Sequence, residues 1–97
     1  MLVEIERFRV DPGDVPLLLE LRGPALAEYR VAVPELRQAD LVRVADDVWL
    51  DIRIWGREVE AIETPLYARM RALMGPPLAH DRGERVHTTG TAWAAGR

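Results

Sequence analysis

The sequence predicts an α+β fold whose elements run in the order β-α-β-β-α-β, the split βαβ arrangement with a four-stranded antiparallel sheet. Three observations support this prediction. Apolar and polar residues alternate over residues 48–55, apolar residues recur at helical spacing over residues 17–33, and proline and glycine separate such segments. A length of 97 residues and a hydrophobic content of 48% suit a single folded domain over residues 1–97.

The first strand is expected over residues 2–10, before a turn that contains proline and glycine. A helix over residues 17–33 follows, with Asp14 as its N-cap, since an Asp side chain accepts hydrogen bonds from the first turn of a helix. Gly23 and Pro24 lie in the middle of this helix. Because proline removes a helical hydrogen bond, we expect a kink there.

Two strands over residues 36–45 and 48–55 are expected to form a hairpin with a two-residue turn at residues 46–47. Such a turn places Asp40 directly opposite Arg53. Residues opposite each other on paired strands share a face of the sheet, so we expect these two side chains to form an ion pair.

The last third of the chain is predicted to contain a broken helix and a strand. A short helix is expected over residues 57–63 and a second over residues 65–74, with Thr64 as its N-cap and proline at its first position. A loop that carries His80 then leads to a last strand over residues 85–94. These elements complete the predicted order.

The strand at residues 48–55 has two unlike faces, because successive side chains of a strand point to opposite sides of the sheet. With the predicted pairing, one sheet face is aliphatic and carries Val3, Ile5, Leu41, Leu50, Ile52 and Ile54. The other face carries Glu6, Phe8, Asp40, Trp49, Asp51, Arg53 and Trp55. A face that mixes indoles with charged groups is a poor dry core and a reasonable lining for a ligand pocket.

The composition excludes several kinds of chemistry. The chain has no Cys, Ser, Asn or Lys, and its 13 basic residues are all Arg. Disulfides, thiolate metal sites, serine nucleophiles and Schiff bases are therefore excluded. His80 and His87 are the only imidazoles and no glycine-rich phosphate motif is present, so we expect no metal, haem or flavin cofactor.

The charge pattern argues against two kinds of partner. The net charge of −3 is small, and neither a basic stripe nor an acidic tail is present, so we expect no nucleic acid and no membrane partner. The N-terminal residues carry acids rather than a basic region, and no run of about 18 apolar residues exists. The sequence therefore predicts a cytoplasmic protein.

The motif "RVDPGD" at residues 9–14, the hairpin "LRQADLVRVADDVWLDIRIW" at residues 36–55, the broken second helix and the final strand together resemble the dimeric α/β-barrel superfamily, antibiotic-biosynthesis-monooxygenase type. The resemblance covers nearly the whole chain. It implies a ferredoxin-like fold and a homodimer in which the aliphatic faces of two four-stranded sheets pack together. It also implies a ligand cleft between each sheet and its own helices.

The resemblance also suggests catalytic residues. Trp55 matches a tryptophan that cofactor-free monooxygenases of this type place in their cleft, and Asp51 matches a position where such enzymes can carry Asn. Asp51 could act as a base, Arg53 could hold an enolate or carboxylate, and His87 could serve in acid–base chemistry. Each of these residues also has a purely structural interpretation. Trp55 would belong to the core, Asp51 would pair with Arg53 or Arg43, and His87 would be an ordinary strand histidine.

Six further residues are expected to contact the ligand. They share the polar sheet face or lie on helix faces that could reach the cleft: Glu6, Phe8, Tyr29, Asp40, Trp49 and Tyr67. The resemblance then implies a small cofactor-independent enzyme that acts on an aromatic or polyketide-like substrate, most simply a monooxygenase. A cyclase or isomerase that uses the same cleft, and a non-catalytic ligand-binding dimer, remain as alternatives. Haem degradation is disfavoured because the chain lacks the Asn that haem-degrading relatives use.

Overall fold

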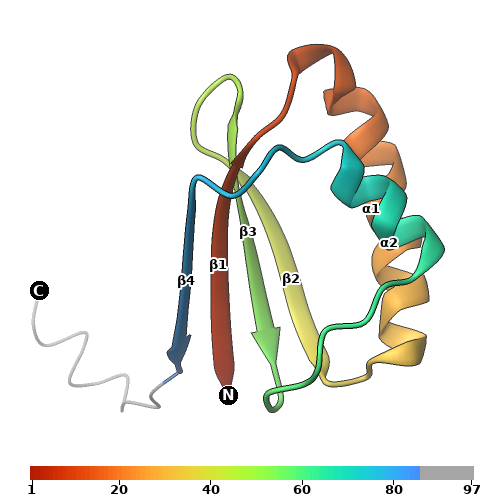
Figure 1. The fold of residues 1–97 in the computed structure, drawn as a ribbon, viewed down its shortest axis with the longest axis vertical. Helices are drawn as coiled ribbons and strands as arrows, with labels where there is room; N and C mark the ends of the chain where they lie inside the picture. The colour runs from red at the N-terminus through yellow and green to blue at the C-terminus, as the bar shows by residue number, and fades with distance from the viewer. Residues whose placement is uncertain (86–97) are drawn as a thin grey trace, which may run out of the picture.

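A four-stranded antiparallel sheet covered on one face by two helices forms the protein (Figure 1), and the computed structural model describes residues 1–85. The elements are β1 (Leu2–Arg9), η1 (Pro12–Asp14), α1 (Val15–Ala32), β2 (Leu36–Arg43), β3 (Val48–Trp55), α2 (Pro65–Ala72) and β4 (Ala79–Glu84). The strand order across the sheet is β2-β3-β1-β4. The fold is thus α+β, as predicted, and its topology is compatible with a ferredoxin-like fold.

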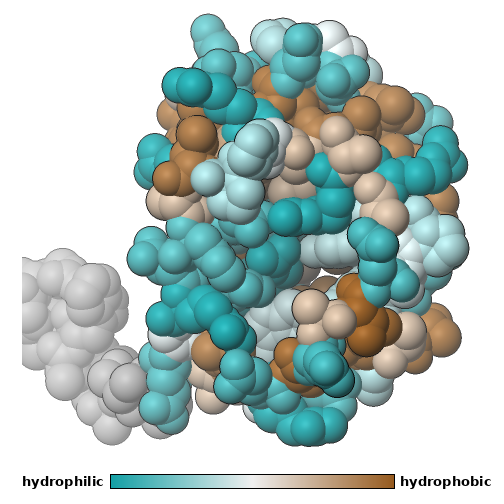
Figure 2. Space-filling model, viewed as in Figure 1, coloured by the Kyte–Doolittle hydropathy of each residue, from teal (hydrophilic) through white to brown (hydrophobic). Residues whose placement is uncertain are grey.

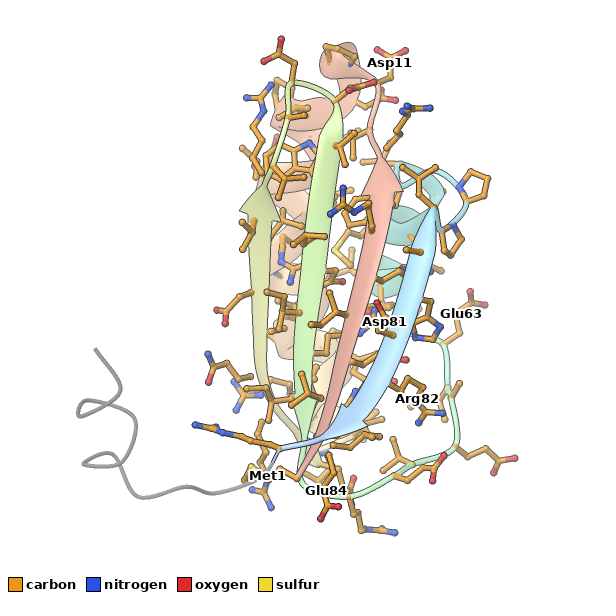
Figure 3. All side chains as sticks on the ribbon, turned by 90° about the vertical axis from the view of Figure 1, so that its left-hand side faces the viewer. Met1, Asp11, Glu63, Asp81, Arg82 and Glu84 are labelled. Carbon is orange, nitrogen blue, oxygen red and sulfur yellow. The ribbon has the colours of Figure 1, made fainter. Side chains whose placement is uncertain are left out.

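The alternation along β3 produces the two faces that the sequence predicts. Trp49, Asp51, Arg53 and Trp55 are buried, while the residues between them are partly exposed. The buried residues face the helices, together with the even-numbered residues of β1, which lie directly opposite them. Figure 3 shows the other face of the sheet, which no helix of residues 1–85 covers.

The predicted register of the β2–β3 hairpin is wrong by one residue. Asp40 pairs with Ile52 and not with Arg53, and Leu41 pairs with Asp51. Asp40 therefore lies on the uncovered face, where it accepts a hydrogen bond of 2.7 Å from Gln38, and the predicted Asp40–Arg53 ion pair does not form. Leu41 lies on the helix-covered face and packs against the core.

A bulge at the turn explains the shift in register. The backbone N–H groups of Val44 and Ala45 both donate to the carbonyl oxygen of Val48, at 2.9 and 3.1 Å. Two residues of one strand therefore stand opposite one residue of the other, which displaces the pairs from Arg43 to Gln38 by one, and a second register shift follows between Gln38 and Leu36.

The fourth strand lies at a different place in the chain from the one predicted. β4 spans Ala79–Glu84 and pairs antiparallel with β1, so His80 belongs to a strand and not to a loop. The predicted strand at residues 85–94 lies outside the described residues, except for Arg85, which follows β4. β4 is exposed along its whole length and rich in charge, and these are properties that natural edge strands share.

The first helix begins earlier than predicted and continues through Gly23 and Pro24. Asp14 occupies the N-cap position of α1, but its side chain makes no capping bond there. The capping bond is made one turn earlier, where the Asp11 carboxylate accepts a hydrogen bond of 2.9 Å from the backbone N–H of Gly13 in η1. The buried residues of α1 form one stripe: Leu18, Arg22, Ala25 and Tyr29.

Residues 57–63 do not form the short helix that the sequence predicts. Seven residues before a Thr-Pro stop offer little cooperative helix formation, and the segment instead packs Val59 against a cluster around Trp55. α2 then begins at Pro65, as predicted, although the Thr64 side chain makes no capping bond. The Glu28 carboxylate of α1 accepts a hydrogen bond of 2.9 Å from the backbone N–H of Leu66 and so caps α2 from outside.

Two buried clusters lie between the sheet and the helices. The larger one is built around Phe8, Val10, Leu18, Ala25, Trp49, Met70 and Met74. The smaller one contains Tyr29, Val33, Leu36 and Trp55. In the described part of the chain, no helix has the length and apolarity that a membrane span requires.

Candidate functional site

A cavity of about 590 Å³ lies between the sheet, α2 and the irregular segment that joins β3 to α2. The hollow opens on the face seen in Figure 2, where hydrophilic and hydrophobic residues adjoin. Leu2, Val59, Ala61 and Ile62 form its apolar lining. A cavity of this volume is large enough for a small ligand of two or three fused rings.

Three aromatic residues form one wall of the cavity. The rings of Tyr29 and Trp55 meet edge to face, with centroids 6.2 Å apart, and those of Tyr29 and Tyr67 lie 4.7 Å apart at 37°. Burial raises the pKa of the Tyr29 phenol, so this side chain stays neutral at physiological pH. The sequence predicted that all three residues face a cleft, and they do border this cavity.

Arg53 borders the cavity, but its guanidinium is already held by protein groups. Its Nε and Nη2 lie 3.1 and 3.0 Å from Oε1 of Glu4, and its Nη1 donates to Tyr67 at 3.0 Å and to Asp51 at 3.3 Å. Burial disfavours the charged form, but Tyr67, Asp51 and Glu4 outweigh it and raise the pKa of Arg53. Arg53 is therefore a fixed positive charge with few N–H groups left for a ligand.

Asp51 lies beneath this arginine and does not border the cavity. Its side chain is 1% exposed, and its Oδ1 accepts a hydrogen bond of 2.9 Å from Nη2 of Arg22 on α1. With Arg53 on its other oxygen, the carboxylate stands between two guanidinium groups. This geometry differs from the predicted open base, because both oxygens are engaged and no free volume adjoins them.

Glu4 is the central acceptor of the site, and sequence reasoning passed over it. Besides Arg53, its carboxylate accepts hydrogen bonds from Trp55 Nε1 at 3.2 Å and contacts His80 Nε2 at 2.6 Å. Burial alone would raise the pKa of Glu4, but the charge of Arg53 and the bonds from His80 and Trp55 lower it below its ordinary value. Glu4 is therefore ionised and a weak base.

We expect the Glu4→Gln variant to lose about 1.5–3 kcal/mol of stability at neutral pH, the usual contribution of hydrogen bonds to a charged group. Because the pKa of Glu4 is lower in the folded state, its contribution is complete above the unfolded pKa and is lost as the pH falls through the folded pKa. Denaturant unfolding between about pH 7 and pH 3 should therefore show a shallower acid loss in the variant than in the wild type.

The matched control for this variant is Glu35→Gln. Glu35 also accepts from an arginine, at 3.1 Å, but that partner, Arg57, has a side chain that is 73% exposed. Exposed pairs of this kind contribute about 0–1 kcal/mol, so the control should follow the wild-type pH profile. An unchanged profile in Glu4→Gln would contradict the assignment.

Two further arginines border the cavity, one on α2 and one on β4. Arg71 of α2 pairs through Nη1 with the buried carboxylate of Glu6. Arg82 of β4 donates from Nη2 to Glu58 at 3.2 Å, and its Nε lies 3.8 Å from Glu4. In Figure 3 the Arg82 side chain extends from β4 toward the segment that carries Glu58 and Glu63.

The remaining predicted site residues lie elsewhere. Phe8 and Trp49 belong to the larger core cluster and do not border the cavity, and Glu6 is buried beneath Arg71. Asp40 lies on the opposite face of the sheet. His87 lies outside the described residues.

Sequence reasoning missed six polar residues of the site: Glu4, Arg22, Glu58, Glu63, Arg71 and Arg82. Two of them had a readable signal. Glu4 has the same parity as Glu6 on β1, so alternation alone places it on the helix-covered face. Arg22 is the one charged member of the buried α1 stripe, which follows helical spacing. Arg71 and Arg82 had no such signal, since one lies on a short helix and the other on a strand that resembled a loop.

Across residues 1–85, no group of three or more His, Asp or Glu side chains is placed to hold a metal ion. What the site offers is a partly apolar cavity with an aromatic wall and fixed charges at one side. No protein-family model and no curated protein matches the chain at the sequence level.

Proposed function

We propose that the protein is a homodimer of the dimeric α/β-barrel type and that the cavity of each subunit binds a small, flat, oxygenated aromatic molecule. The observation that carries this proposal is the wall formed by Tyr29, Trp55 and Tyr67 beside a fixed arginine. Aromatic faces favour a planar ring system, and neighbouring N–H donors favour its oxygen atoms.

The dimer part of the proposal rests on the uncovered sheet face. Val3, Ile5, Leu50, Ile52 and Ile54 lie there on the two central strands. Polar residues flank them on the outer strands, with Gln38 and Asp40 on one side and Asp81 on the other. An apolar centre with a polar rim is the usual anatomy of a subunit interface, and a second copy of this sheet is the complementary surface.

The reaction we propose is cofactor-independent oxygenation of an aromatic or polyketide-like substrate. The substrate carbanion itself would reduce oxygen, with one oxygen atom entering the substrate as a carbonyl and the other leaving as water. Arg53, which borders the cavity, would stabilise the negative charge, and the aromatic wall would hold the ring and exclude water. Because Glu4 is a weak base, such a substrate must be acidic in its own right.

The acids of the site are already hydrogen-bonded to protein groups, and this favours a second candidate, a non-catalytic ligand-binding dimer. Asp51 is bonded to two arginines, and Glu4 accepts from several donors, so neither is poised to take a proton. A cyclase or isomerase that uses the same cavity without oxygen would need such a proton acceptor and is the least favoured reading.

One experiment separates these functions. Oxygen uptake with an anthrone substrate supports the monooxygenase, turnover under argon supports the cyclase or isomerase, and binding without turnover supports the ligand-binding dimer. We expect Trp55→Ala to lower affinity for the anthrone by tenfold or more, about 1.4 kcal/mol, because the variant loses the ring wall.

The control is Trp49→Phe, which changes a tryptophan on the same strand face that does not border the cavity. Its affinity should stay within about twofold of wild type, a change of less than about 0.5 kcal/mol. Equal losses in both variants, or none in Trp55→Ala, would count against the cavity as the binding site.

A further inference from the structure

The three arginines that border the cavity differ in how many N–H groups they have free. Arg53 is engaged by Glu4, Asp51 and Tyr67. Arg71 uses Nη1 on Glu6, and Arg82 uses Nη2 on Glu58. The other N–H groups of these two side chains have no hydrogen-bond acceptor among residues 1–85. A guanidinium presents its donors in a flat fork that matches a carboxylate, so two arginines that border the cavity keep donors for an acceptor of that kind.

Three acids border the cavity, Glu4, Glu58 and Glu63, and the first two are already paired with protein groups. Glu4 is saturated by Arg53, Trp55 and His80. The Glu58 side chain is 74% exposed and pairs only with Arg82, so its hold on that arginine is the weak hold of a surface pair. The cavity therefore has spare donors on two arginines, while its spare acceptor, the Glu63 carboxylate, is on an exposed residue where water screens its charge.

The strand register places these groups at one end of the cavity. Leu2 lies opposite Trp55, and the next row toward the middle of the sheet is Arg53, Glu4 and Arg82 on three adjacent strands. Arg71 pairs with Glu6, two residues and about 7 Å further along β1. The cavity is thus apolar and aromatic around Trp55 and rich in guanidinium groups in the next two rows of the same sheet face.

We infer that the ligand of this cavity is an aromatic monocarboxylate, whose carboxylate lies between Arg71 and Arg82 and whose rings lie against Trp55 and Tyr29. This inference deepens the proposed function and depends on it, since it names the chemical class of molecule that the cavity takes. In this arrangement the ligand carboxylate displaces Glu58 from Arg82, and Arg53 keeps the floor of the cavity in place.

The test compares two probes of equal shape, 2-naphthoate and its neutral amide, 2-naphthamide, by calorimetric titration of the full chain. We expect 2-naphthoate to bind at least tenfold more tightly than 2-naphthamide. We also expect the difference to shrink as the salt concentration rises, because the arginines are partly exposed.

Two variants should change the affinity for 2-naphthoate in opposite directions. Arg82→Gln should weaken it at least tenfold, and Glu58→Gln should strengthen it about threefold, since the carboxylate no longer competes with a protein acid. Both side chains lie at the surface, so neither change should prevent folding. The control Arg57→Gln removes an exposed arginine that does not border the cavity and should leave both affinities unchanged.

The outcomes separate this inference from the proposed function. Equal affinity for the two probes, or an effect of Arg82→Gln on 2-naphthamide as large as on 2-naphthoate, overturns the carboxylate assignment and leaves the aromatic cavity standing. Failure of both probes to bind, together with failure of the anthrone, overturns both proposals.

Discussion

Replacing Asp51 with Asn is expected to destabilise the protein by about 3–5 kcal/mol, the usual loss when one partner of a buried ion pair is removed. The Asp51 side chain is 1% exposed and bridges Arg22 and Arg53. The amide keeps the shape but offers one acceptor and no charge, so two buried guanidinium groups lose their shared counter-ion. Urea unfolding followed by circular dichroism measures the loss.

The matched control is Asp40→Asn, the same substitution at an exposed acid on the other face of the sheet. Its effect should stay within about 0.5 kcal/mol, as is usual for surface positions. The double variant Arg22→Met/Asp51→Asn should lose less than the sum of the single losses, because the first change removes a charge that the second leaves unpaired. A loss below about 0.5 kcal/mol in Asp51→Asn would show that the ion pairs of Asp51 do not stabilise the fold.

Replacing Ile52 with Asp is expected to raise the dissociation constant of the proposed homodimer by a factor of about 1,000 or more, about 4 kcal/mol. Ile52 lies on the uncovered face between Ile5 and Asp40. A carboxylate there would be buried without a cation and beside another acid, and a two-fold interface would carry the change twice. Analytical ultracentrifugation across the micromolar range measures the shift from dimer to monomer.

Leu19→Asp is the control for this variant, because Leu19 lies on α1 and is 53% exposed. It makes an equal change of chemistry away from the uncovered face and should leave the dimer intact. A wild-type protein that is monomeric at micromolar concentration, or an Ile52→Asp variant that stays dimeric, refutes the interface.

Local pattern was sufficient to predict most of the fold. The alternation in β3 and the helical spacing in α1 are signals that hold over many residues, and both elements form where they were expected. The register of β2 could not be read in the same way, because it depends on a bulge beside the turn at Val44 and Ala45 and on a second shift between Leu36 and Gln38. Neither residue type distinguishes a bulge from regular pairing.

The position of β4 depended on tertiary context. Its sequence, AHDRGE, contains no β-branched or aromatic residue and thus resembles a loop. It forms a strand because β1 offers it an unpaired edge, and because His80 and Arg82 find the Glu4 carboxylate across that edge.

The candidate site was predictable only in part, because local pattern shows which side chains share a face but not which distant residues meet. The indole and phenol groups at Trp55, Tyr29 and Tyr67 border the cavity where the sequence suggested a cleft. For Asp51 the sequence left open a catalytic base or a partner of Arg53 or Arg43, and in the structure it pairs with Arg53 and also with Arg22. The pairing with Arg22 joins residues that are 29 positions apart, and no local pattern in either segment shows which acid the helix arginine will meet.

The charged residues on the helix-covered face of the sheet also have a consequence for misfolding. If β1 slipped by one residue against β3, Glu4 and Glu6 would point to the uncovered face, and Val3 and Ile5 would lie under the helices. Apolar residues would tolerate that exchange, since both faces carry them. Arg53 and Arg71 would not, because the slip would separate Arg53 from Glu4 and Arg71 from Glu6. The ion pairs thus disfavour competing strand registers of the same chain, in addition to any stability that they give the native one.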